Sequence, residues 1–490
     1  MAKKLPKIGK YVLDTLSIGM YNSPLMLIRE YIQNSTDAID ELEKHEVKKG
    51  YELKIEINVD GRNRTLKISD NGIGIPAKDA SKVLLNIGES NKDSIHNRGF
   101  RGIGRLGGVG YCDRLKFKTK YIGETKYSVC DWDCNRLRRL IKNKNKYNAS
   151  EIIKKVTDFK QLHYQGNDND HFFIVEMGKV QSSRDILMNV PFIKNYLSQV
   201  LPVSFNKSKF SFSDEIDVIL RKEIPKYKNY NVYINKEKIY KPYSDSVILR
   251  GKIKDKISKI EYIELKSVFG DLALAWIAKL KLYGSISPSC LVEGIRVRSG
   301  NILIGNKHLL DEFFRERRFD SYLVGELHIK DHRIVPNSRR DDFEDNEFRE
   351  ELYDSFIKNI GLPYSRMIRQ DSIKRNVEKN KLLGNEIIRS ADNIIDNGYY
   401  SEIQKNKIIR RLRNYKNKKN NGNNADEIVK KMIDLYNAES FFSKRNSDFS
   451  YRTKCFLQKT SDIVFQNSLD EIKAEKIVER IINRAKDISL

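Results

Sequence analysis

No run of apolar residues in this sequence approaches the ~18 that a membrane-spanning helix requires, so a spanning segment is excluded. The amino terminus carries basic residues with no continuous apolar core behind them, and we therefore expect no secretory signal. The five cysteines form no C-x-x-C pair, which argues against a zinc ribbon or a disulfide scaffold. Together these absences predict a protein of the reducing cytoplasm that does not enter a membrane.

Acidic residues are outnumbered by basic ones. There are 66 Asp and Glu against 91 Lys and Arg, which gives a net charge of +25. Part of the excess lies in residues 361–420, where fifteen Lys and Arg face six Asp and Glu. A basic surface attracts polyanions such as nucleic acid. Lys, Asn, Ile and Tyr are abundant along the whole chain, however, so compositional drift explains the charge equally well.

The length of 490 residues leaves room for about three domains of roughly 150 residues. We predict boundaries at 1–180, 181–345 and 346–490. We predict that the first domain is a mixed α/β (α+β) sandwich with helices on one face of a sheet. The second domain should be richer in strands, and the third should be a basic helical region. In the first domain the expected elements are helices at 24–45 and 76–87 and strands at 53–59, 65–69, 115–120, 126–129 and 172–177.

The first candidate cluster lies on the predicted helix 24–45. Glu30, Asn34 and Asp37 are four and then three residues apart, so they share one face of that helix. A carboxylate in such a row is able to orient a water, and an amide oxygen is a hard ligand of the kind that Mg²⁺ accepts beside phosphates and waters. An ordinary solvated polar face has the same spacing, so this pattern alone does not decide between the two.

The second candidate cluster is the turn Asp70-Asn-Gly72-Ile-Gly74, which follows a predicted strand. The two glycines allow a ligand to approach the backbone closely. The Asp70 carboxylate is able to accept a hydrogen bond from an exocyclic amine such as that of adenine. A strand–turn–helix connection with an Asp cap would look similar.

The third cluster is glycine-rich and runs from Gly99 to Gly110, with six glycines and two arginines in twelve residues. Exposed backbone N–H groups and arginines suit a polyphosphate. The G-x-G-x-x-G pattern within it does not follow a first strand, so a dinucleotide-binding fold is excluded, and the absence of G-K-[ST] excludes a Walker A loop.

Taken in order and spacing, the E-x-x-x-N-x-x-D-A helix, the D-x-G-x-G turn and the glycine-rich segment resemble the GHKL ATPase superfamily of gyrase, heat-shock chaperones, histidine kinases and MutL. The resemblance implies a Bergerat-type ATP-binding fold, ATP and Mg²⁺ as ligands, and ATP hydrolysis. Glu30 would be the general base, Asn34 the Mg²⁺ ligand, Asp37 a supporting contact, and Asp70 the acceptor of the adenine amine. The further ATP-binding residues that the resemblance implies are Gly72, Gly74, Ser90, Lys92, Gly102, Gly104, Arg105, Gly107, Gly108 and Gly110, of which Gly104 to Gly110 would wrap the phosphates as a lid.

Within this superfamily the sequence is most similar to the HtpG-type heat-shock chaperones. Residues 12–40 resemble their opening helices, and residues 294–297 and 334–343 resemble parts of their middle, or transducer, domain. That domain supplies an arginine to the terminal phosphate from an N-x-x-R-[ED] segment, which implies Arg340 as a catalytic residue with Arg339 as the runner-up. The threonine that the superfamily usually places near the adenine has no counterpart in residues 171–177.

The resemblance implies Mg-dependent ATP binding and hydrolysis that drives lid closure and clamping of a homodimer, with chaperone-like action on protein clients. Two alternatives stay open. One is a MutL-like or MORC-like ATPase acting on nucleic acid in DNA repair or phage defence. The other is a nucleotide-gated interaction scaffold with little turnover.

Overall fold

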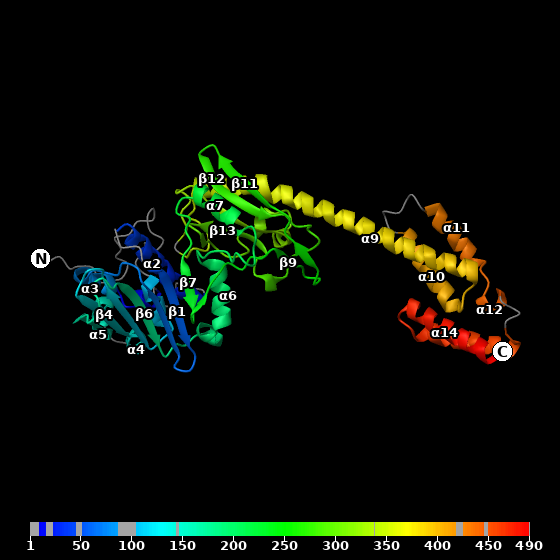
Figure 1. Ribbon diagram of the computed structural model, residues 1–490, viewed down its shortest axis with the longest axis horizontal. Helices are drawn as coiled ribbons and strands as arrows, with labels where there is room; N and C mark the ends of the chain where they lie inside the picture. The colour runs from blue at the N-terminus through cyan, green and yellow to red at the C-terminus, as the bar shows by residue number, and fades with distance from the viewer. Residues whose placement is uncertain are drawn as a thin grey trace. The chain divides into compact units, whose positions relative to one another are not determined.

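The computed structural model describes residues 9–15, 23–45, 51–86, 104–143, 147–337, 339–417, 425–444 and 449–489. The chain divides into two compact units, Met1–Ile368 and Arg369–Leu490, each of which is described by itself (Figure 1). Every helix within those ranges lacks the length or the hydropathy that a membrane span would need.

The amino-terminal part of the first unit is built on one large sheet. Its strands are β1 (Lys54–Asp60), β2 (Thr65–Asp70), β3 (Arg114–Lys120), β4 (Lys126–Asp133), β5 (Thr157–His163), β6 (Phe172–Gly178), β7 (Asn231–Ile234) and β8 (Glu237–Lys238). Among the described residues their order across the sheet is β5-β4-β3-β6-β2-β1-β7-β8. Neighbours are antiparallel except β1 and β7, which are parallel.

The sheet has one apolar and one polar face because its strands alternate. On β1, for example, Ile55, Ile57 and Val59 are buried, whereas the residues between them are partly or fully exposed. The buried face shares its core with residues of the surrounding helices. These helices are α1 (Tyr11–Asp14), α2 (Leu25–Glu43), α3 (Ala77–Leu85), α4 (Cys134–Lys142), α5 (Ala149–Val156) and α6 (Val190–Val200).

The rest of the first unit packs around a second hydrophobic core, formed by residues between Phe205 and Ile368. A sheet in the order β11-β12-β15-β13-β14 runs through it, and β9 and β10 form a small separate pair. The strands are β9 (Ser246–Ile248), β10 (Lys254–Lys256), β11 (Ile260–Ser267), β12 (Gly270–Ala278), β13 (Gly294–Ser299), β14 (Ile302–Leu303) and β15 (Val324–Ile329), and the helices are α7 (Ser213–Glu223) and α8 (Glu347–Phe356).

The second unit is helical throughout its described residues, apart from one isolated bridge between Tyr399 and Ser440. It begins within α9 (Leu362–Asn397), which belongs to both units. Two small apolar clusters hold it together, one centred on α9, α10 and α11 and the other on α12, α13 and α14. The bounds are α10 (Glu402–Lys416), α11 (Ala425–Tyr436), α12 (Phe441–Lys444), α13 (Tyr451–Asn467) and α14 (Glu471–Ser489).

The predicted mixed α/β fold with following domains and a helical carboxyl-terminal region is confirmed. The sequence analysis did not predict α4, α5 or β5, and β5 is mostly exposed, so it has no clear alternation of buried and exposed residues. The division at residues 180 and 345 stays a prediction. β7 comes after residue 180, yet it extends the first sheet, because Val232 and Ile234 continue its buried face.

Candidate functional site

Helix α2 carries the first predicted cluster. Its apolar residues, including Leu27, Ile28 and Ile32, are fully buried in the core of the first sheet. Glu30 and Asn34 are half-buried, and Asp37 is buried. The helical period therefore brings a carboxylate and an amide to the accessible side of a helix whose other side is fixed by packing.

The carboxylate of Asp70, at the end of β2, is buried beside the carboxyl-terminal half of α2. The hydroxyl of Ser35 donates to Asp70 Oδ2 at 2.6 Å, and the N–H of Gly72 donates to Asp70 Oδ1 at 2.9 Å. Hydrogen bonds to an ionised carboxylate are among the stronger ones in proteins. Ser35 and Gly72 thus fix the direction in which Asp70 faces a ligand.

The turn after Asp70 is held tightly against its surroundings. The N–H of Ile73 donates to the carbonyl of Ala38 on α2 at 3.1 Å, and the N–H of Ile75 donates to Thr119 Oγ1 on β3 at 2.9 Å. Gly74 has a φ of +75°, and a Cβ there would lie 1.9 Å from the carbonyl oxygen of Lys120. Only glycine fits this position, because any side chain would collide with the backbone of β3.

The part of the glycine-rich segment that the structure describes is a 3-10 helix, η2 (Gly104–Gly110), which includes Arg105 and Gly107. Leu106 and Val109 are buried in the core of the first sheet. The N–H of Gly108 donates to the hydroxyl of Tyr31 on α2 at 3.0 Å. This end of the segment is therefore packed against α2. The predicted residues Ser90, Lys92 and Gly102 lie outside the described residues.

Arg340, which follows the second sheet in the chain, lies next to Glu30 of the first predicted cluster. Its Nε lies 3.6 Å from Glu30 Oε1, with 13% of the arginine side chain and 19% of the glutamate side chain exposed. A tight turn holds it: the N–H of Arg340 donates to the carbonyl of Asn337 at 3.1 Å, and its own carbonyl accepts from Gly305 at 2.8 Å. Arg339, by contrast, is 61% exposed and faces Asp341 at 3.9 Å. Of the two candidate arginines, only Arg340 is seen to pair with Glu30.

Arg29, directly before Glu30, connects α2 to the same region and is 3% exposed. Its guanidinium donates to the carbonyl of Leu303 on β14 at 2.5 Å. It also interacts with Tyr196 on α6, where burial raises the pKa of the hydroxyl and Arg29 opposes that effect. β14 therefore contacts Arg29 through Leu303, and Gly305, which follows the strand, contacts the turn of Arg340.

A buried charge cluster fixes the β13–β14 hairpin. Arg298 Nε donates to Glu326 Oε1 at 2.5 Å, and its terminal nitrogens bond the carbonyls of Asn301 and Gln199 at 3.0 and 2.8 Å. Lys241 pairs with Glu326 at 2.8 Å. Burial acts to raise the pKa of Glu326, but Arg298 and Lys241 outweigh it and hold that pKa well below its usual range. An ion cluster with no exposure resists rearrangement, because removing one partner leaves the others uncompensated.

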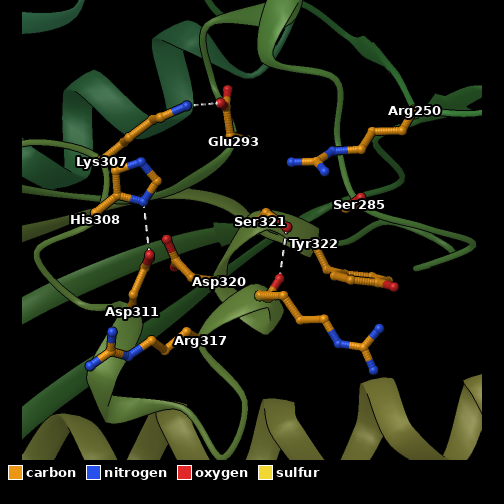
Figure 2. A pocket seen from close by; sticks show the side chains of 11 residues that line it. Arg250, Ser285, Glu293, Lys307, His308, Asp311, Arg317, Asp320, Ser321 and Tyr322 are labelled. Atoms are coloured by element: carbon orange, nitrogen blue, oxygen red, sulfur yellow. Dashed lines mark hydrogen bonds and ion pairs between the residues drawn. The ribbon is translucent and has the colours of Figure 1, made fainter.

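A cavity of about 300 Å³ lies elsewhere in the second core, and none of the predicted site residues lines it. Figure 2 shows that charged side chains on its wall pair with one another: Lys307 with Glu293, and His308 with Asp311 at 2.8 Å. Burial raises the pKa of Asp320 to about 8. The residues that line the cavity are Arg250, Ser285, Glu293, Lys307, His308, Asp311, Arg317, Arg318, Asp320, Ser321 and Tyr322.

Sequence reasoning missed four residues that contact the predicted site, namely Arg29, Tyr31, Ser35 and His171. A signal existed for Arg29, because a charged residue between the buried positions Ile28 and Ile32 needs a partner. His171 stands immediately before β6, with Nδ1 2.8 Å from the carbonyl oxygen of Gly72. No pattern in the sequence distinguishes it from the other six histidines.

The residues present fit a magnesium ion that is also held by substrate. The described residues contain no group of three His, Cys, Asp or Glu side chains able to hold a metal by themselves. Magnesium does not require such a cage, since it is usually bound through one or two protein oxygens, phosphates and waters. Asn34, one turn after Glu30, offers one such oxygen.

Residues 21–165 match the family model described as histidine kinase-, DNA gyrase B-, and HSP90-like ATPase. That range contains α2, the Asp70 turn and η2. Residues 21–165 are therefore similar to GHKL-type ATPases, in agreement with the resemblance that the three motifs indicated.

Among curated proteins, the chain is similar to chaperones named HtpG. The chaperone protein HtpG of Fusobacterium nucleatum is 29% identical over 184 residues, which are 34% of this chain and 29% of that protein. HtpG of Coxiella burnetii is 25% identical over 308 residues, 58% of this chain and 43% of that protein. HtpG of Campylobacter jejuni is 36% identical over 90 residues, 17% and 15% respectively. The chain thus spans less than half the length of each of these relatives.

Proposed function

We propose that this protein binds ATP against α2 and the Asp70 turn and hydrolyses it with Glu30 as general base and Arg340 as the residue that stabilises the terminal phosphate. The observation that carries the proposal is the approach of Arg340 Nε to Glu30 Oε1, at 3.6 Å. Two segments far apart in the sequence supply a base and a cation to one point. Phosphoryl transfer depends mostly on positioning and charge stabilisation, which such a pair provides.

In this mechanism Asp70 accepts the adenine amine, and the phosphates extend along α2 toward Glu30. The Glu30 carboxylate accepts a hydrogen bond from the attacking water and orients it. The Arg340 guanidinium neutralises charge that develops on the terminal phosphate. Asn34 would hold magnesium, which supplies further charge neutralisation on the phosphates when bound.

The biological output that we propose is chaperone-like action on protein clients, through ATP-favoured lid closure and clamping of a homodimer. The similarity to HtpG chaperones supports this output. ATP favours a closed state only through contacts that the open state lacks. A contact between the terminal phosphate and Arg340 is of this kind, because it links the ATPase domain to the second core.

A nucleic-acid-acting ATPase is the second candidate. α10 supports it, because it carries six Lys and Arg but only one acidic residue, and Arg410, Arg413 and Lys416 are exposed. Polyanion binding by such a surface falls steeply with salt. Stimulation of turnover by duplex DNA at low salt, lost at high salt, would favour this candidate over the chaperone.

The experiment that tests the proposal is steady-state ATP hydrolysis by the purified chain with Mg²⁺, with and without duplex DNA. Glu30→Ala should lower kcat by at least about a hundredfold, the range of a general base, while ATP still binds. Glu41→Ala is the matched control, because Glu41 lies on the same helix, has a side chain that is 48% exposed and pairs with the exposed Lys44. Tight ATP binding with turnover no higher than that of Glu30→Ala would instead indicate a nucleotide-gated scaffold.

A further inference from the structure

His171 lies beside the proposed base-binding turn, although no sequence motif includes it. It precedes β6 directly, and two residues later Phe173 pairs with Asp70 across the sheet. His171 is only 7% exposed. Buried polar atoms of this kind require partners inside the protein, so the contacts of its ring are informative.

Both ring nitrogens of His171 have partners. Nδ1 is 2.8 Å from the carbonyl oxygen of Gly72, and Nε2 is 2.5 Å from the hydroxyl of Tyr51. A carbonyl oxygen only accepts, so Nδ1 carries a proton, and in the neutral ring Nε2 accepts from the Tyr51 hydroxyl. The chain of contacts continues to the proposed adenine acceptor, because the N–H of Gly72 donates to Asp70 Oδ1 at 2.9 Å.

The backbone that carries His171 is anchored as well. Lys120 is fully buried, and its Nζ donates to the carbonyls of Asp168 and Asp170 at 2.7 and 2.6 Å. The carbonyl of Lys120 is also the atom against which Gly74 packs. One end of β3 therefore holds both the loop before His171 and the turn after Asp70, so the ring meets Gly72 in a fixed geometry.

We infer that His171, supported by Tyr51, is a positioning residue for recognition of the nucleotide base: it holds the carbonyl of Gly72, and the N–H of the same residue orients Asp70 toward an exocyclic amine. The inference rests on the proposed function and names the part of the ligand that His171 serves, an adenine ring. His171 touches neither Glu30 nor Arg340, so it acts on affinity and base selectivity and leaves the chemical step unchanged.

The decisive comparison is between two amides at position 171. In His171→Asn the side-chain nitrogen takes the place of Nδ1 and still donates to Gly72, whereas in His171→Gln it is displaced by one bond. We expect the ATP Kd of His171→Gln to rise about tenfold and that of His171→Asn to stay within about threefold of wild type, as the loss of one buried hydrogen bond predicts. The maximal rate of hydrolysis should be the same in both variants.

Binding is measured by calorimetric titration of the full chain with Mg-ATP and Mg-GTP, and hydrolysis is measured in parallel. His163→Gln is the matched control, because His163 ends β5 and is exposed. Tyr51→Phe removes only the hydroxyl that contacts His171 Nε2, so it should weaken ATP binding by about twofold to threefold.

These measurements distinguish a failure of the His171 inference from a failure of the proposed ATP-binding function. If wild type binds ATP and Asp70→Asn binds it at least about tenfold more weakly, but His171→Gln binds as tightly as His171→Asn, the positioning role is wrong while the proposed function stands. A lower melting temperature in His171→Gln with an unchanged ATP Kd would likewise reduce His171 to a structural residue. If wild type binds no ATP at all, both the proposed function and the inference are wrong.

Discussion

The two ends of helix α2 are held in different ways. Toward the carboxyl end, Ser35 contacts Asp70 and Ala38 contacts Ile73. Asp70 ends strand β2 of the first sheet, and Ile73 lies in the turn that follows it. Toward the amino end, Arg29 donates to the carbonyl of Leu303, which lies 274 residues further along the chain. The end of α2 that we propose binds the base is therefore held by the first sheet and its turns, whereas the end that we propose is catalytic also contacts the region of the second core.

This difference separates binding from turnover. In the proposed binding mode, a nucleotide base would meet groups that β2, β3 and β6 hold in place, so the affinity for the base should depend on the first sheet. In the same binding mode, the terminal phosphate would meet Glu30 beside Arg340, whose turn is hydrogen-bonded to Gly305 after β14. Hydrolysis should respond to changes in the second core that leave affinity untouched, and the predictions below test that separation.

The largest effect is expected from Arg340→Ala. The guanidinium is nearly buried against Glu30, and loss of an arginine that stabilises a transferring phosphoryl group lowers kcat by about a thousandfold. The ATP Kd should change by less than about threefold, because base recognition lies at the other end of α2. Steady-state kinetics and equilibrium titration measure the two quantities separately.

Arg339→Ala is the control for that prediction, because Arg339 is the next residue, has the same charge and is 61% exposed. It should hydrolyse ATP at close to the wild-type rate. Equal losses of kcat in the two variants would mean that the segment acts through its net charge. The specific role that we propose for Arg340 would then be wrong.

The next largest effect is expected from Asp70→Asn at the opposite end of the helix. An amide has one acceptor oxygen, so it cannot accept from both Ser35 and Gly72 and also receive the adenine amine. Loss of hydrogen bonds to a charged group should raise the ATP Kd by roughly tenfold to a hundredfold. Asp60→Asn, which changes a half-buried carboxylate at the end of β1, should bind ATP like wild type. If Asp70→Asn binds normally, the adenine pocket has been misplaced.

The difference between local and long-range contacts also explains which candidate site residues could be predicted from the sequence. Spacing on one helix was enough to align Glu30, Asn34 and Asp37, and a glycine-spaced turn after a strand marked Asp70. These residues could be predicted from local patterns, because each prediction depends on residues that lie close together in the chain. The partners Ser35 and His171 were invisible, since their roles arise from strand pairing and from the path of the turn. Arg340 was reached through family resemblance, because no local pattern relates two segments so far apart.

Arg29→Met should slow turnover without changing affinity. Methionine keeps much of the buried apolar volume but leaves the Leu303 carbonyl without its donor, so β14 and the Arg340 turn lose one link to α2. We expect kcat to fall by about tenfold at an unchanged ATP Kd, the size expected when one buried charged hydrogen bond is lost. Arg221→Met, at an exposed position on α7, is the control. A rise in Kd as large as the fall in kcat would contradict the separation of the two ends.

The smallest effect is expected from Ser35→Ala, which removes one donor to Asp70 Oδ2 and leaves Gly72 on Oδ1. The carboxylate keeps its charge and one fixed oxygen, so the ATP Kd should rise only about fivefold, with kcat unchanged. Thr36→Val is a demanding control, because Thr36 is the next residue, is fully buried, and uses its hydroxyl on the carbonyl of Gln33 within α2. Both variants lose one buried hydroxyl and should lose similar stability, so thermal unfolding does not distinguish them. Only the hydroxyl that faces Asp70 should change affinity, and equal ATP Kd values in the two variants would show that general loosening of α2, rather than the orientation of Asp70, governs binding at this end.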